Sequence, residues 1–116
     1  MSKNGSAVYQ LRLSEKGFAI TARAIQELSL RNGKYETLPG VVAHTINSIR
    51  EIDTLIVREL DGQITSDGDI KVHLRLDNKT RDLFKEYQAS LSAIVEHPVT
   101  VRDCVVLMSL LVLNEV

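Results

Sequence analysis

Two short stretches of the chain alternate strictly between apolar and polar positions. Residues 7–13 and residues 70–76 each place every second side chain on an apolar face, and these faces consist of Ala7, Tyr9, Leu11 and Leu13 and of Ile70, Val72, Leu74 and Leu76. Alternation with a period of two is typical of a β-strand that is buried on one face. The pattern therefore predicts two half-buried strands.

The opposite faces of these strands are polar and hold no acidic residue. The side chains on them are Val8, Gln10 and Arg12 in the first strand and Lys71, His73 and Arg75 in the second. Most of these groups can hydrogen-bond to base edges or to phosphates. A single strand of this kind is also typical of an ordinary sheet edge, where Lys and Arg prevent pairing with other chains. Whether the two strands pair with each other therefore decides between a binding surface and an ordinary edge.

Each strand precedes a segment with helical spacing of apolar residues. The first predicted helix runs from about Glu15 to Leu30 after a Ser14 cap, and Asn32-Gly33 provides its stop. The equivalent later helix is capped by Asp77 and ends at His97-Pro98, because proline disfavours helical geometry in the residue before it.

Two further helices are predicted, each after a threonine cap. Thr37 precedes a long helix that extends to about Leu60, and Thr100 precedes a helix from Val101 to about Asn114. The last helix is apolar on nearly every side, so it must be buried, either between repeats or between protomers. Residues 61–69 are polar and glycine-containing, as expected of a linker.

The chain contains an internal repeat. When residues 70–116 are moved back by 63 positions, they overlay residues 7–53 without a gap, and the identical positions are Leu11, Arg12, Leu13, Lys16, Leu28, Ser29, Thr37 and Val42. We therefore expect one domain, 1–116, made of a strand–helix–helix unit at 7–60, the linker 61–69 and a second unit at 70–116. The predicted fold is α+β and mostly helical, with the strands paired as an intramolecular antiparallel ribbon over a helical core. The repeat predicts that Gln10 lies near His73.

This arrangement resembles the ribbon-helix-helix family of DNA-binding proteins, the Arc/MetJ type, in a tandem form with both halves in one chain. The family inserts a two-stranded ribbon into the major groove. The resemblance implies that the base-contacting residues are Val8, Gln10, Arg12, Lys71, His73 and Arg75. It also implies phosphate contacts at the starts of the second helices, at Thr37 and Thr100.

Composition narrows the remaining possibilities. The chain has 116 residues and a net charge of −1, and its lone cysteine, Cys104, has apolar neighbours and is expected to be a buried thiol. No residue spacing indicates a metal site, a nucleophilic triad or a glycine-rich phosphate loop. We expect no cofactor, no enzymatic activity and no membrane span, and therefore a cytoplasmic protein.

Two classes of function remain besides a small α+β domain with no nucleic-acid role. The first is sequence-specific binding of double-stranded DNA, as a transcriptional regulator or repressor or as an accessory factor in conjugation, plasmid or phage DNA processing, with possible self-association on adjacent subsites. The second is a protein-interaction module, in which the apolar helices bind a partner such as a relaxase or a toxin.

Overall fold

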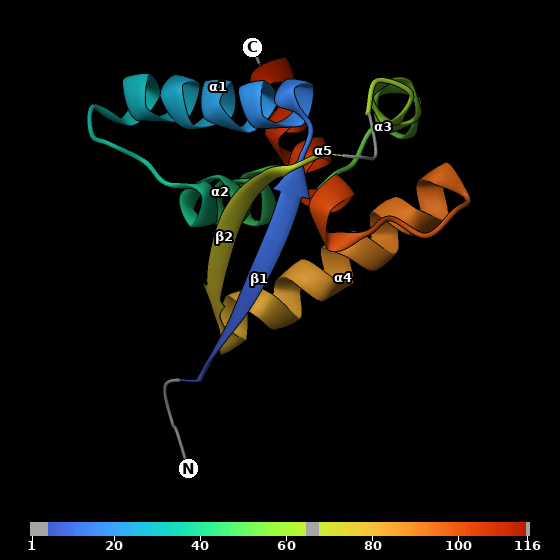
Figure 1. Cartoon of the computed structure of the whole chain (residues 1–116). Coiled ribbons are helices and arrows are strands. Elements are labelled where there is room, and N and C mark those ends of the chain that lie inside the picture. The colour runs from blue at the N-terminus through green and yellow to red at the C-terminus, as the bar shows by residue number, and fades with distance from the viewer. Residues whose placement is uncertain (1–4, 65–67, 116) are drawn as a thin grey trace.

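The two predicted strands form a single antiparallel sheet. The computed structural model describes residues 5–64 and 68–115, and Figure 1 shows its two strands side by side. Strand β1 spans Ser6–Leu13, β2 spans Ile70–Asp77, and Gln10 lies opposite His73. The expected pairing and register are therefore confirmed.

Five helices make up most of the described chain, so the α+β, mostly helical class is also confirmed. In chain order they are α1 (Glu15–Asn32), α2 (Leu38–Ser48), α3 (Thr54–Asp61), α4 (Asn78–Val95) and α5 (Val101–Asn114).

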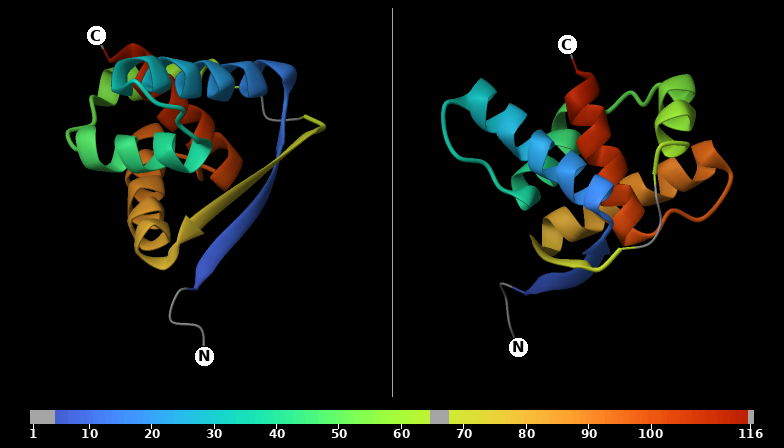
Figure 2. Two further views of the ribbon diagram at one scale, coloured as in Figure 1. Left: turned by 90° about the vertical axis from the view of Figure 1, so that its left-hand side faces the viewer. Right: turned by 45° about the horizontal axis from the view of Figure 1, so that its top comes forward.

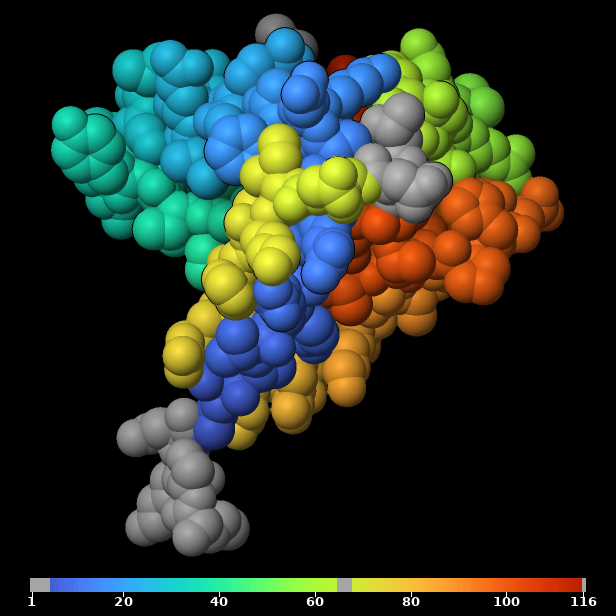
Figure 3. Space-filling model, viewed as in Figure 1, coloured from blue at the N-terminus to red at the C-terminus, as the bar shows by residue number. Residues whose placement is uncertain are grey.

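The helices lie on one side of the sheet. The left view of Figure 2 shows the helices gathered to one side of the ribbon, and in Figure 3 both strands form part of the front surface. Leu11, Leu13, Leu74 and Leu76 face the helices and are buried. Burial of this apolar face stabilises the ribbon, which as an isolated two-stranded sheet would be marginal in water.

Helix α5 forms the centre of the core. Nine consecutive residues, from Cys104 to Val112, are buried in it. The helix packs against α1, α2, α3, α4 and β1. The prediction that this helix is buried is confirmed, and its partners lie in the same chain.

The prediction of one helix from Thr37 to Leu60 is wrong. Helix α2 ends at Ser48, and α3 begins after Asp53, whose carboxylate accepts hydrogen bonds from the amides of Leu55 and Ile56. The apolar spacing continues as one stripe from α2 into α3, but the chain turns between the two helices. At this turn the hydroxyl of Tyr87 donates a hydrogen bond to the carbonyl oxygen of Ile49 at 2.9 Å.

The predicted linker 61–69 is also shorter than expected. Asp61 is the last residue of α3, and residues 65–67 lie outside the described chain. Gly68 lies against the backbone of Leu13 and Ser14 and leaves no room there for a Cβ atom. The chain at Gly68 therefore lies against the end of β1, where only glycine fits.

The two halves share element lengths and local hydrogen bonds. Helices α1 and α4 both have 18 residues, and their caps, Ser14 and Asp77, each accept a hydrogen bond from the amide three residues later. The hydroxyl of Ser29 donates to the carbonyl of residue 25 and accepts from the amide of residue 36. The hydroxyl of Ser92 repeats both bonds 63 residues later, with residues 88 and 99.

The ends of α1 and α4 have the same backbone shape but different residues. Gly33 ends α1 in the left-handed conformation, with φ of 65°, as its sequence predicts. At the equivalent place after α4, Glu96 has φ of 62°. Helix α4 thus ends at Val95, and only Glu96 separates its end from His97-Pro98, where the sequence predicts it.

Candidate nucleic-acid interface

The six predicted base-contacting residues lie together on the outward face of the ribbon. Strand alternation turns each of them away from the core, and all six are exposed. The antiparallel register joins them as three cross-strand pairs, which are Val8–Arg75, Gln10–His73 and Arg12–Lys71. The sheet therefore presents one continuous surface of six side chains.

This surface is cationic and differs along its length. Arg12 and Lys71 are opposite each other near one end, whereas Arg75 lies opposite Val8, which is 53% exposed, near the other. The guanidinium Nη1 of Arg75 donates to the hydroxyl of Ser6 at 3.1 Å, which restrains the arginine on the ribbon surface.

One carboxylate lies at the edge of the surface. Asp77 is the last residue of β2, which extends one residue beyond the predicted acid-free strand at 70–76. Its carboxylate accepts a hydrogen bond from the amide of Thr80 at 2.7 Å, and this bond lowers the pKa of Asp77. The charge is therefore used to cap α4 and lies outside the three cross-strand pairs.

A groove runs between β1 and the start of α5. Gln10 and Arg12 line one wall, and Thr100 and Arg102 line the other. Arg102 was not among the predicted site residues. Arg102 is the second residue of α5, and the repeat places it opposite Pro39 of the first half. A basic residue so close to a helix start is the sequence signal that could have identified it.

A second groove runs between β2 and the start of α2. It is lined by Arg75, by Pro39 and Gly40 of α2, and by Thr80. The arginine of each strand therefore faces the helix start that belongs to the other half of the chain. This crossed arrangement brings both predicted helix starts beside the ribbon.

Thr37 and Thr100 are exposed and act as helix caps. The hydroxyl of Thr37 accepts from the amide of Gly40 at 3.2 Å, and that of Thr100 accepts from the amide of Asp103 at 3.1 Å. Both residues thus occupy the predicted position at the positive end of a helix, which favours an anion. The cap already uses one amide at each helix start, and Pro39 supplies none at α2.

A carboxylate lies beside each of these helix starts. Glu36 lies close to Gly40 and accepts a hydrogen bond from Asn32, and Asp103 pairs with Arg102 at 3.2 Å. Negative charge at these places repels a phosphate. A phosphate in the groove beside α2 would therefore depend on Arg75 as well as on the helix end. A phosphate in the groove beside α5 would depend in the same way on Arg12 and Arg102.

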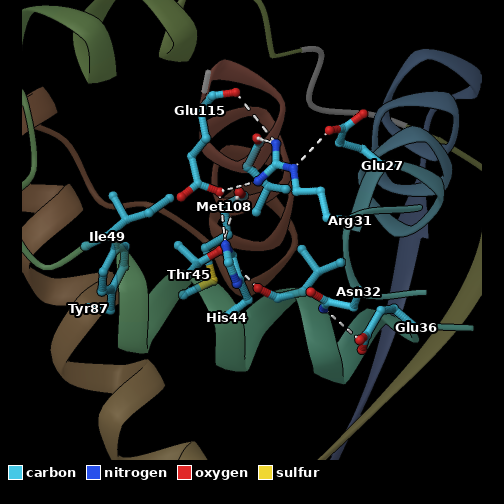
Figure 4. A network of polar contacts seen from close by, with 12 residues as sticks. Glu27, Arg31, Asn32, Glu36, His44, Thr45, Ile49, Tyr87, Met108 and Glu115 are labelled. Carbon is cyan, nitrogen blue, oxygen red and sulfur yellow. Dashed lines mark hydrogen bonds and ion pairs between the residues drawn. The ribbon is translucent and has the colours of Figure 1, made fainter. Parts of the chain in front are cut away.

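A separate polar cluster, away from the ribbon, joins α1 and α2 to the residue that follows α5. Figure 4 shows the Glu115 carboxylate between Arg31 of α1 and His44 of α2. Oε1 of Glu115 is 2.9 Å from Arg31 Nη1 and 2.9 Å from His44 Nε2. Partial burial raises the pKa of Glu115, but the bonds from His44 and Arg31 outweigh it and the net shift is downward. His44 and Arg31 together fasten Glu115, the residue after α5, to α2 and α1.

Among the residues that the structure describes, no group of three or more His, Cys, Asp and Glu side chains is placed to hold a metal ion. Cys104 is buried, as expected, and burial raises its pKa to about 12, so its thiol stays protonated at neutral pH. None of the helices within the described ranges has both the length and the apolar character needed to cross a membrane.

Comparison of the chain with protein-family models, curated proteins and solved structures gave no match.

Proposed function

We propose that this protein binds double-stranded DNA by inserting the β1–β2 ribbon into the major groove. The observation that carries the proposal is the outward face of the ribbon, where six exposed side chains form three pairs that hold no acid. A two-stranded ribbon fits the major groove, where each base pair presents a distinct set of donors and acceptors.

The chemistry of the three pairs supports base reading. Arginine and lysine pair with O6 and N7 of guanine, and glutamine pairs with N6 and N7 of adenine. Val8 offers an apolar contact to a thymine methyl group. Because the paired residues are unlike, a single chain is expected to read an asymmetric subsite.

The groove residues would hold the backbone on either side. In this proposal Thr100 and Arg102 face one phosphate strand, and the start of α2, which Thr37 caps, faces the other beside Arg75. The crossed grooves support two clamps flanking one ribbon. Phosphate contacts of this kind fix register, whereas sequence preference comes from the ribbon.

We further propose that the chain is a tandem ribbon-helix-helix protein, non-enzymatic, that acts as a regulator or a DNA-processing accessory factor. The equal lengths of α1 and α4 and the repeated bonds of Ser29 and Ser92 support a duplicated unit. Helix α3 follows the first strand–helix–helix unit and lies outside the residues that the repeat overlays.

Selection of bound duplexes from a random library tests the proposal. The protein is expected to enrich a non-palindromic motif containing at least one guanine, with binding that weakens steeply as salt rises. A protein-interaction module that uses the apolar helices would enrich no motif, and that result would overturn the proposal.

A further inference from the structure

The molecule has two ends of different character. The first, called the α1–α2 end, is the surface around Arg23, Leu30, Lys34 and Tyr35. The second, called the α3 end, is the surface around Glu51, Asp53, Leu55 and Glu59. Figures 1 and 2 show the α1–α2 turn and α3 on opposite sides of the molecule.

The α1–α2 end exposes two large apolar side chains next to each other. Leu30 is 73% exposed and Tyr35 is 99% exposed, and both line a groove with Gly33 and Lys34. Leu30 also lines a second groove, with Arg23 and Leu113. Single exposed apolar residues are common on proteins, but two that share a groove form a candidate contact surface.

The α3 end also exposes an apolar side chain, surrounded by acids. Leu55 is 76% exposed. Glu59 lies one helical turn later on the same side of α3, opposite the buried Val57 and Leu60. The inner face of α3 is thus occupied by the core, and its outer face is available.

The charges of the two ends are complementary. Residues 23–36 contain three basic and two acidic side chains, whereas residues 51–61 contain four acidic and one basic. At the α1–α2 end Arg31 is already paired with Glu27 at 2.8 Å and with Glu115 at 2.9 Å, and Lys34 lies 3.9 Å from Glu36. The positive charge offered to a partner therefore comes from the exposed Arg23 and from Lys34, whose side chain is still 71% exposed. Opposite charges attract and help to orient two surfaces that meet.

We propose that the α3 end of one copy of this chain binds the α1–α2 end of a second copy. Leu55 would cover the groove at Leu30 and Tyr35, with Glu59 near Lys34 or Arg23. Because the two faces differ, the contact is head-to-tail. A pair of chains therefore keeps one α1–α2 end and one α3 end free to bind further copies. Such contacts form open assemblies unless a ring closes.

This contact does not involve the outward face of the ribbon and does not rest on DNA binding. On DNA it would place neighbouring copies beside one another with their ribbons still exposed.

Sedimentation equilibrium of the full chain without DNA tests the contact with two variants. The first carries Leu30→Ser and Tyr35→Ser, and the second carries Leu55→Ser and Glu59→Lys. The average mass of the parent should rise with concentration, and each variant alone should associate about tenfold or more weakly, as expected when interface anchors are removed. An equimolar mixture of the two variants retains one intact pair of faces, so its mass should level off at two chains.

Phe18→Ser is the matched control, because Phe18 is 44% exposed near the start of α1 and lines neither groove of the α1–α2 end, and this variant should associate like the parent. Circular dichroism checks that every variant is folded. The proposal is wrong if the parent remains a single chain at all concentrations, even if another protein binds its α1–α2 end. It is also wrong if the variants associate like the parent or if mixing them restores nothing. None of these results bears on DNA binding, since the assay contains no DNA.

Discussion

Single residues set the backbone shape after the two long helices. Gly33 and Glu96 both adopt the left-handed conformation, with φ of 65° and 62°. Glycine has no Cβ atom and adopts this conformation at no steric cost, whereas other residues are strained in it. The same turn is therefore relaxed in the first half of the chain and strained in the second.

Two reciprocal substitutions test this difference. Glu96→Gly should raise the free energy of unfolding by about 0.5–1 kcal/mol, and Gly33→Ala should lower it by about 1 kcal/mol. No atom lies within 4 Å of a Cβ built on Gly33, so backbone strain alone accounts for the second effect. Urea unfolding of both variants measures the changes, and a loss of stability in Glu96→Gly would contradict the assignment.

At the same scale, the sequence located the outward ribbon residues correctly because strand alternation is a local property. Arg12 and Arg75 were assigned to the outward face from period-two spacing alone. Arg102 was missed because it approaches Arg12 only through the packing of α5 against β1. The carboxylate of Glu36 near Gly40 was missed for the same reason, since sequence spacing does not give side-chain directions in a loop.

At the scale of elements, α3 is the part that the sequence described least well. Its apolar residues continue the spacing of α2, so the pattern favoured one helix. In the structure Asp53 caps a new helix, which is tied to the second half by a bond from Arg58 to the carbonyl of Ile94 and by an ion pair between Asp61 and His97. These are tertiary contacts, which periodicity does not reveal.

The Asp61–His97 pair predicts how the docking of α3 depends on pH. The hydrogen bond to Asp61, at 2.8 Å, and a second to the carbonyl of Pro98 raise the pKa of His97. A raised folded-state pKa gives stability that is complete below the unfolded pKa, about 6.5, and is lost as pH rises through the folded value. Because the imidazole is exposed, the effect should be small.

Urea unfolding on both sides of that pH range measures the effect. The parent should lose this stability as the pH rises, and His97→Gln should show a smaller loss. The matched control is His73→Gln, since His73 is an exposed histidine on the ribbon, and this variant should behave like the parent. A pH dependence that is unchanged in His97→Gln would show that the pair does not stabilise α3.

At the scale of the whole molecule, the fold positions one uncovered sheet face. Helix α5 supplies the apolar centre, the helices cover the inner side of the ribbon, and the outer side remains exposed. The class, the pairing and the register follow from the sequence because alternation and the 63-residue offset both constrain them. The division of α2 from α3 and the two grooves do not follow from it, because each depends on how separate elements pack.

The central claim is that the outward face of the ribbon binds duplex DNA. Its most direct test is the affinity of Arg12→Ala and Arg75→Ala for a duplex selected by the parent, at one fixed salt concentration, with Arg50→Ala as the control. Arg50 is also exposed and lies after α2, in a groove that it shares with residues of α4 and with no residue of the ribbon. Each ribbon variant should bind about 1–3 kcal/mol more weakly, with the fold intact and the control unchanged. Binding by both ribbon variants as tight as that of the parent would contradict the claim.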